Sequence, residues 1–418
     1  MYDGARLFGP KVQAGYTDPR SHPHFDDART WFATGNRQFD VIVSEPSNPW
    51  VTGVASLFTR EWYALVRRHL HPDGVMVQWI QTYELDDRLL STMVAALVRE
   101  FPYVDVYLTN SSDLIFVASG RPIQPLDMAA FGVEPLHSEL AGVGLSLPGD
   151  FAVRRIGSQR VLRAFVNYTG APEHSDFHPV VSLDGPRARF MRESSYVLQG
   201  LVTNGMPVLD ILEGRAPPPA DAVTDEPQSA FAQGHAVGRE VAGALRTGDT
   251  RALQALAPDA AAPARDLLSM HGAIGADAMP RWYADVATLA GKSIGALPAD
   301  ALAGAWTNPA WIAGDAALPP AARATLDAFD AAARRDVAHL REKAVAALEA
   351  LRLEPSAPDV LREQMLVLAM LGAIGERRPG DVGALEHRWG GSIPPSGTYE
   401  PIRVFLQAWV DLPAAPPR

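Results

Sequence analysis

The residues that could do chemistry are concentrated in one short stretch, residues 40–50. It reads DVIVSEPSNPW, an apolar run that ends in the carboxylate of Glu45 and continues through two prolines with Ser47 and Asn48. Proline disfavours both helix and central strand, so the segment after the run is expected to be a loop that presents its polar side chains. In open α/β sheets, ligands bind beyond the carboxyl ends of the strands. A carboxylate there could hold an ammonium group and accept its proton, or it could merely cap the next helix or pair with an arginine.

The elements that would position this stretch are short β-type runs and amphipathic helices within residues 1–125. This alternation is typical of an open α/β sheet. Residues 57–70 and 84–101 carry apolar side chains at helical spacing, which predicts two helices. The expected strands are DVIVSE (40–45), GVMVQWIQ (74–81), VDVYLT (104–109) and LIFVAS (114–119). The last two are expected to be antiparallel, because NSSD (110–113), like HPDG (71–74), is typical of a turn.

The rest of the chain divides into three parts by composition. Residues 126–212 continue the first domain less regularly, and residues 213–228 are Pro-rich and acidic, as in a linker. Residues 229–412 are Ala-rich and predict helices almost throughout, most clearly at 321–353 and 359–374. The expected fold is therefore an α/β domain followed by an all-α helical domain.

Composition excludes several classes of protein. The 418 residues are 47% hydrophobic and 20% charged, which is enough to build sizeable cores. The net charge of −11, without a basic stripe, argues against a nucleic-acid partner. The absence of cysteine excludes disulfides, Cys–zinc sites and thiol catalysis. No apolar run approaches ~18 residues and the opening lacks signal-peptide features, so we expect no membrane span and a cytoplasmic location.

Several segments, taken in order, resemble one family. They are DPR (18–20), DDARTWFA (26–33), FDVIVSEPSNPWVTGVASLFTREWY (39–63) and LHPDGVMVQWIQTYEL (70–85). They resemble the spermidine synthases (polyamine aminopropyltransferases), and more closely the bacterial spermidine-synthase-like proteins that are often fused to membrane helices. The resemblance covers about residues 1–120, with a weaker echo at 174–190. It implies an α/β, Rossmann-like sheet of the class I methyltransferase type, a small-molecule amine substrate, decarboxylated S-adenosylmethionine as co-substrate and no metal.

The resemblance also implies which residues bind the co-substrate. Asp27 would contact the adenine amino group, and Ala28 and Ser47 would line the same site. Tyr83 or Trp79 would supply an aromatic wall, against which a sulfonium gains roughly 0.5–2 kcal/mol.

On the amine side, the resemblance gives roles to three residues. Glu45 would stand for the aspartate that receives the amine's proton, Asn48 for a second, polyamine-contacting carboxylate, and Gln78 for the glutamine near the amine. The longer Glu45 and the neutral Asn48 depart from the family pattern and weaken the case for a dicationic diamine. Two alternatives therefore stay open, an S-adenosylmethionine-dependent methyltransferase and a non-catalytic scaffold or regulatory protein.

Part of the family's sheet has no counterpart in this sequence. Its first two strands and its Gly-rich loop, which lets backbone N–H groups approach the cofactor, are not found. SHPHF (21–25) would then be an edge strand without a neighbour, and residues 40–45 would be a bare edge open to another chain. The chain would be a late-started fragment, a decayed or regulatory derivative, or one part of an assembly in which a second copy or a partner supplies the strands. We expect the chain alone to bind an adenosyl sulfonium poorly.

Two histidine patterns admit a metal site. His22 and His24 alternate along the expected edge strand, and residues 174–178 read H-x-D-x-H. A solvent-exposed strand edge explains His22 and His24 better. A structural counterpart of the family's acidic segment explains residues 174–178 better. No G-x-S-x-G elbow supports a hydrolase.

Overall fold

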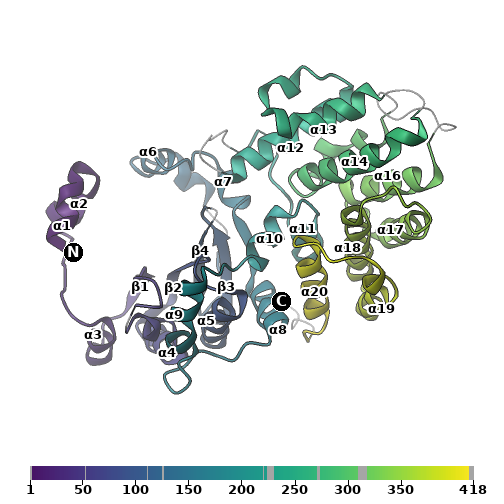
Figure 1. The fold of residues 1–418 in the computed structure, drawn as a ribbon. Coiled ribbons are helices and arrows are strands. Elements are labelled where there is room, and N and C mark those ends of the chain that lie inside the picture. The colour runs from purple at the N-terminus through teal and green to yellow at the C-terminus, as the bar shows by residue number, and fades with distance from the viewer. Residues whose placement is uncertain are drawn as a thin grey trace.

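The computed structural model describes residues 2–413 except residues 52, 111, 125–126, 220, 224–229, 271–273 and 309–317. A twisted sheet with its helices forms one half of the molecule, and a helical half lies beside it (Figure 1). Two short N-terminal helices stand apart from the sheet and are joined to it by an extended segment (Figure 1). No helix within the described residues is both long and apolar enough to cross a bilayer.

The sheet has five strands in the order β1-β2-β4-β3-β5. Only the β1–β2 pair is parallel, and the other pairs are antiparallel. The strands are β1 (Phe39–Ser44), β2 (Leu70–Gln81), β3 (Tyr103–Leu108), β4 (Asp113–Ser119) and β5 (Arg155–Ser158). The predicted antiparallel pairing of the third and fourth runs is confirmed, since Asn110 closes the turn between β3 and β4 by accepting the N–H groups of Ser112 and Asp113.

Two strand predictions are wrong. Residues 21–25 form no strand, because among the described residues no other strand pairs with them and a lone strand cannot satisfy its backbone hydrogen bonds. Strand β2 begins at Leu70, so HPDG is no turn between elements. It forms an irregularity inside the β1–β2 pairing, where the register passes from Phe39–Leu70 to Val41–Val75.

The two faces of β1 differ. Ile42 is buried on the side of the sheet that carries the core, whereas Val41 and Val43 on the other side are 54% and 66% exposed. Because β1 has a partner on one side only, it forms an edge of the sheet among the described residues. The prediction that residues 40–45 form a bare edge is confirmed.

Several helices of the first half pack against the sheet, whereas the N-terminal ones stand apart from it. The predicted helices at 57–70 and 84–101 begin later than expected, because Thr59 and Asp86 cap them by accepting backbone N–H groups of Trp62 and Leu89. The helices, with 3-10 turns marked η, are α1 (Tyr2–Ala5), η1 (Arg6–Val12), α2 (Ala14–Thr17), α3 (Ala28–Thr34), η2 (Val54–Phe58), α4 (Arg60–Arg68), α5 (Asp87–Glu100), η3 (Met128–Gly132), α6 (Leu136–Ala141), α7 (Pro148–Ala152), α8 (Gln159–Thr169), α9 (Val180–Met191), α10 (Val197–Thr203) and α11 (Val208–Glu213).

The second half is helical, as predicted. Its elements are α12 (Ala230–Thr247), η4 (Ala252–Ala255), α13 (Pro258–Ser269), η5 (Ala276–Ala278), α14 (Met279–Ser293), α15 (Ala299–Leu302), η6 (Ala305–Thr307), α16 (Pro320–Ala333), α17 (Val337–Leu351), α18 (Asp359–Gly375), α19 (Pro379–Trp389), η7 (Gly390–Ser392) and α20 (Tyr399–Val410). The helix expected at 359–374 is confirmed as α18. The single helix expected at 321–353 is wrong, because the chain reverses at Arg335, whose φ is +54°, and α16 and α17 pack together.

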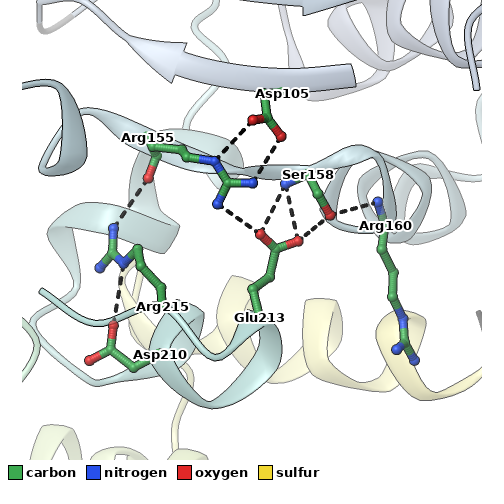
Figure 2. A network of polar contacts seen from close by, with 7 residues as sticks. All are labelled: Asp105, Arg155, Ser158, Arg160, Asp210, Glu213 and Arg215. Carbon is green, nitrogen blue, oxygen red and sulfur yellow. Dashed lines mark hydrogen bonds and ion pairs between the residues drawn. The ribbon is translucent and has the colours of Figure 1, made fainter. Parts of the chain in front are cut away.

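A polar network joins the sheet to α11 and to the start of the predicted linker (Figure 2). Arg155 of β5 donates to Asp105 of β3 at 2.8 Å and to Glu213 at the end of α11 at 3.1 Å. Arg215, two residues later, donates to the carbonyl of Arg155 and to Asp210. The start of the predicted linker is thus fixed to the sheet.

The two halves also share one hydrophobic core, in which the C-terminal helix α20 packs on α8 of the first half. The division of the chain into domains at residues 125, 212 and 228 stays a prediction.

Asp285 on α14 makes the stability of the helical half depend on pH. Burial, with the nearby Asp266 carboxylate, raises its pKa to about 6 from 3.8, against the opposing effect of Arg281. The folded state therefore favours the protonated carboxyl, so stability falls as pH rises from about 4 to about 6. We expect Asp285→Asn to stabilise the protein at pH 7 by about 1 kcal/mol, allowing for solvent screening.

Thermal unfolding between pH 4 and pH 8 measures this effect. The stabilisation by Asp285→Asn should shrink as pH falls from about 6 to about 4. The control Asp277→Asn, on the exposed turn before α14, should leave the unfolding temperature unchanged. A gain that grows at low pH would contradict the assignment.

Candidate active site at the carboxyl ends of the parallel strands

The carboxyl ends of β1 and β2 lie side by side. Their register places Ser44 opposite Gln78, so the loop after β1 (residues 45–53) and the loop after β2 (residues 82–86) leave the sheet at the same edge. The Gln78 amide reinforces this arrangement by donating to the carbonyls of Ser44 at 3.2 Å and Trp79 at 2.9 Å. This edge of the sheet is where a ligand is expected to bind.

Two glutamines near this edge have unsatisfied amide groups. Gln78 is fully buried, and its side-chain oxygen has no hydrogen-bond partner among the described residues. The same holds for both amide atoms of Gln81 at the end of β2. An unpaired buried amide costs about 1–3 kcal/mol, which a polar ligand or water could recover. Gln81 was not predicted as a site residue, although it is a polar residue at a strand end.

The loop after β1 meets the loop after β2 through polar and aromatic side chains. Asn48 donates from its amide to the Tyr83 hydroxyl at 3.3 Å, and the Trp50 and Tyr83 rings meet edge to face at 6.4 Å. Glu45 and Ser47 are exposed, and among the described residues Glu45 forms no hydrogen bond or ion pair. The structure thus brings the predicted residues Asn48 and Tyr83 together. The carboxylate of Glu45 is exposed at the start of the loop after β1.

A cavity of about 460 Å³ opens beside these loops, and α9 forms its far wall. The Arg189 guanidinium lies 5.6 Å from the centre of the Trp50 ring and 3.8 Å from the Glu84 carboxylate. Phe190 and Arg192 complete the wall, whereas Glu45 does not line this cavity. Arg189 and Glu84 were not predicted as site residues. Their only sequence signal is that they lie within, or next to, the segments that carry the resemblance.

The weaker echo at 174–190 attaches α9 to the first half of the chain. His174 is fully buried and donates from Nε2 to the Ala55 carbonyl at 3.0 Å, and burial lowers its pKa. Asp176 forms two hydrogen bonds with Arg29 of α3, at 2.8 and 2.6 Å, which lower the pKa of that carboxyl. The polar residues of this segment therefore hold α3, η2 and α9 together, and no metal-binding group of three or more His, Asp or Glu occurs within the described ranges.

The predicted co-substrate residues occupy different places. The Asp27 carboxylate caps α3 by accepting the N–H of Thr30 at 2.8 Å, which lowers its pKa. Among the described residues, no hydrogen bond or ion pair links Asp27 or Ala28 to the loop after β1. Trp79 lies half-buried on the other face of β2 from Gln78. The structure therefore brings Gln78, Asn48 and Tyr83 to one edge but does not add Asp27, Ala28 or Trp79 to them.

A carboxylate that was not predicted fixes the loop after β2. Asp87 accepts hydrogen bonds from the Ser195 hydroxyl at 2.6 Å and from the N–H groups of Tyr196 and Val197 at 3.2 Å. Burial raises its pKa. Because Tyr83 also bridges to Ser194, the segment before α10 holds this side of the crevice.

Comparison with known proteins gives a consistent assignment for the first part of the chain. Residues 1–112 match the family model of the spermine/spermidine synthase domain. The polyamine aminopropyltransferase of Nitrosomonas europaea is 36% identical over 109 residues, which are 26% of this chain and 33% of that protein. The polyamine aminopropyltransferase of Moorella thermoacetica is 30% identical over 106 residues, 25% of this chain and 37% of its own length. The chain thus spans about a third of the length of these relatives.

The matched residues run from α1 to the turn after β3 and include both parallel strands with the loops that follow them. The first part of the chain is therefore a spermidine synthase-like segment with a Rossmann-like sheet.

Proposed function

We propose that this segment transfers an aminopropyl group from decarboxylated S-adenosylmethionine to a small-molecule amine. The observation that carries the proposal is the parallel β1–β2 pair with Ser44 opposite Gln78. This register gathers Glu45, Gln78 and the Asn48–Tyr83 pair at one ligand-binding edge. The similarity of residues 1–112 to the spermine/spermidine synthase domain supports the same reaction type.

In the proposed reaction, the amine nitrogen attacks the carbon next to the sulfonium. The new C–N bond forms as the C–S bond breaks, and sulfur leaves with the bonding electrons as a neutral thioether. The exposed Glu45 carboxylate accepts the proton that the amine loses, while Asn48, Tyr83 and Gln78 hold the amine in line. Asp27, Ala28 and Ser47 are proposed to bind the adenosyl part.

Replacement of Glu45 tests this proposal. We expect Glu45→Gln to lower kcat/KM about hundredfold, because the amide cannot accept the proton. The matched control is Glu139→Gln on the exposed helix α6, which should keep wild-type activity. Mass spectrometry of the products formed with decarboxylated S-adenosylmethionine, at high co-substrate concentration, measures both.

The same assay separates the alternatives. A methylated product formed from S-adenosylmethionine would identify a methyltransferase instead. Consumption of neither co-substrate would favour a scaffold role and overturn the proposal.

Calorimetry should show that 5′-methylthioadenosine binds more weakly than in the micromolar range, since no Gly-rich loop brings backbone N–H groups to it.

Asn48 is proposed to set the choice of amine. Asn48→Asp would place a second carboxylate beside Tyr83, so we expect the KM of a dicationic diamine to fall roughly tenfold, as for a charge-assisted hydrogen bond. Asn36→Asp, at the opposite end of β1, adds the same charge away from the crevice and should change KM little. An equal response of the two variants would show that only net charge matters.

A further inference from the structure

A second cavity lies outside the crevice, where the two halves of the molecule meet. It has a volume of about 420 Å³ and is formed by the segment from α10 to the predicted linker together with α12, α13 and α14. This volume is within the usual range of small-molecule sites. Neither the crevice nor the proposed reaction uses any residue of this cavity.

The base of the cavity is closely packed backbone. Gly205, with a φ of +78°, precedes α11, and its carbonyl accepts the N–H of Gly295 at 2.6 Å. A Cβ at Gly205 would overlap the carbonyl oxygen of Gly291 on α14, and one at Gly238 on α12 would lie 2.9 Å from the carbonyl of Lys292. The walls are therefore held at fixed positions by backbone contacts, so the site is largely formed before any ligand binds.

The charged side chains that line the cavity are Arg215 and Lys292, and none of its described lining residues is a carboxylate. Arg215 is held in place by Asp210 and by the carbonyl of Arg155 (Figure 2). Lys292 is half-buried and forms no ion pair with a carboxylate in the part of the chain that the structure describes. A half-buried ammonium without a counter-charge favours an anion.

The remaining surface is mainly apolar. Val202, Val237 and Pro217 face the same space, and Gly234 on α12 leaves the wall open because no heavy atom lies within 4 Å of the position of a Cβ there. A ligand that fits needs an apolar body as well as an anionic end.

We propose that this cavity binds a small organic carboxylate with an apolar body. The carboxylate pairs with Lys292 near Arg215, and the apolar body packs on Val202 and Val237. The site belongs to the junction of the two halves and is independent of aminopropyl transfer.

The first test concerns charge. Binding of octanoate to the full chain is measured by isothermal titration calorimetry. Octanoate should bind roughly tenfold more tightly than octan-1-ol, and octylammonium should not compete with it. Lys292→Gln should weaken octanoate binding by the same factor, whereas Lys343→Gln, at another half-buried lysine on α17, should not.

The second test concerns space. Gly234→Leu should fill the cavity and abolish octanoate binding while preserving the fold, because leucine favours helix over glycine. Gly243→Leu is the matched control, since this glycine lies on the same helix with equally open surroundings but does not line the cavity. Circular dichroism checks that both variants are folded.

Three results would overturn the proposal: no octanoate binding, equal binding of octan-1-ol, or binding unaffected by both Gly234→Leu and Lys292→Gln. If Gly234→Leu fails to fold, the lysine pair still decides.

Discussion

Replacing Gly205 by alanine is expected to destabilise the protein by more than about 4 kcal/mol. The new methyl group would overlap the carbonyl oxygen of Gly291, which is backbone and cannot rotate away. The residue also has a φ of +78°, a left-handed conformation that costs alanine roughly 1–2 kcal/mol. To relieve the overlap, α14 would have to move away from the turn before α11, and the hydrogen bond from Gly295 to Gly205 would be lost.

Gly214→Ala separates the steric overlap from the conformational strain. Gly214 has a similar φ of +66°, but nothing lies within 4 Å of its Cβ position. We therefore expect a loss of only roughly 1–2 kcal/mol from conformational strain. Urea unfolding followed by circular dichroism gives both values. Equal losses in the two variants would show that the close contact with Gly291 does not exist.

Removing the carboxylate of Asp210 is expected to cost about 3–5 kcal/mol. Its side chain is 2% exposed and accepts hydrogen bonds from Arg215 at 3.3 Å and from Arg335 at 2.7 Å. These arginines come from the start of the predicted linker and from the reversal between α16 and α17. In Asp210→Ala, two largely buried guanidinium groups would lose their shared counter-charge.

An exposed ion pair is the control for Asp210. Asp184 and Arg88 are about half exposed and lie 3.2 Å apart, so Asp184→Ala should change stability by less than about 1 kcal/mol. The same urea titration compares them, and high salt should not reproduce the effect of Asp210→Ala, because buried pairs are screened little. A loss below about 1 kcal/mol for Asp210→Ala would mean that the Asp210–Arg335 pair does not help to hold the halves together.

The strands and the helical half were predictable from the sequence because their signals are local. Runs such as VDVYLT and LIFVAS alternate between a buried and a half-exposed face, and an Asn-led turn closes their hairpin. The bare edge at Val41 and Val43 also followed from sequence, through the family resemblance. Gln78, Asn48 and Tyr83 lie at one edge because of the register between β1 and β2. Local residue patterns do not give this register, and only the family resemblance suggested it.

Other features depended on contacts between distant residues. Residues 21–25 have a strand-like pattern, yet a strand needs a neighbour, and the described residues offer none. The helix pattern at 321–353 is continuous, but Arg335 adopts a positive φ and donates to Asp210, 125 residues earlier.

The sequence by itself determined the spermidine synthase-like character of the first 112 residues, the types of most elements and the polar composition of the loop after β1, because these depend on residue type and spacing along the chain. Only the tertiary structure decided that Arg189 covers Trp50, that Asp210 pairs with Arg335 of the helical half, and that Gly205 contacts α14 so closely. Each of these contacts joins residues far apart in sequence, and their positions are set by packing and charge pairing, which no local pattern encodes.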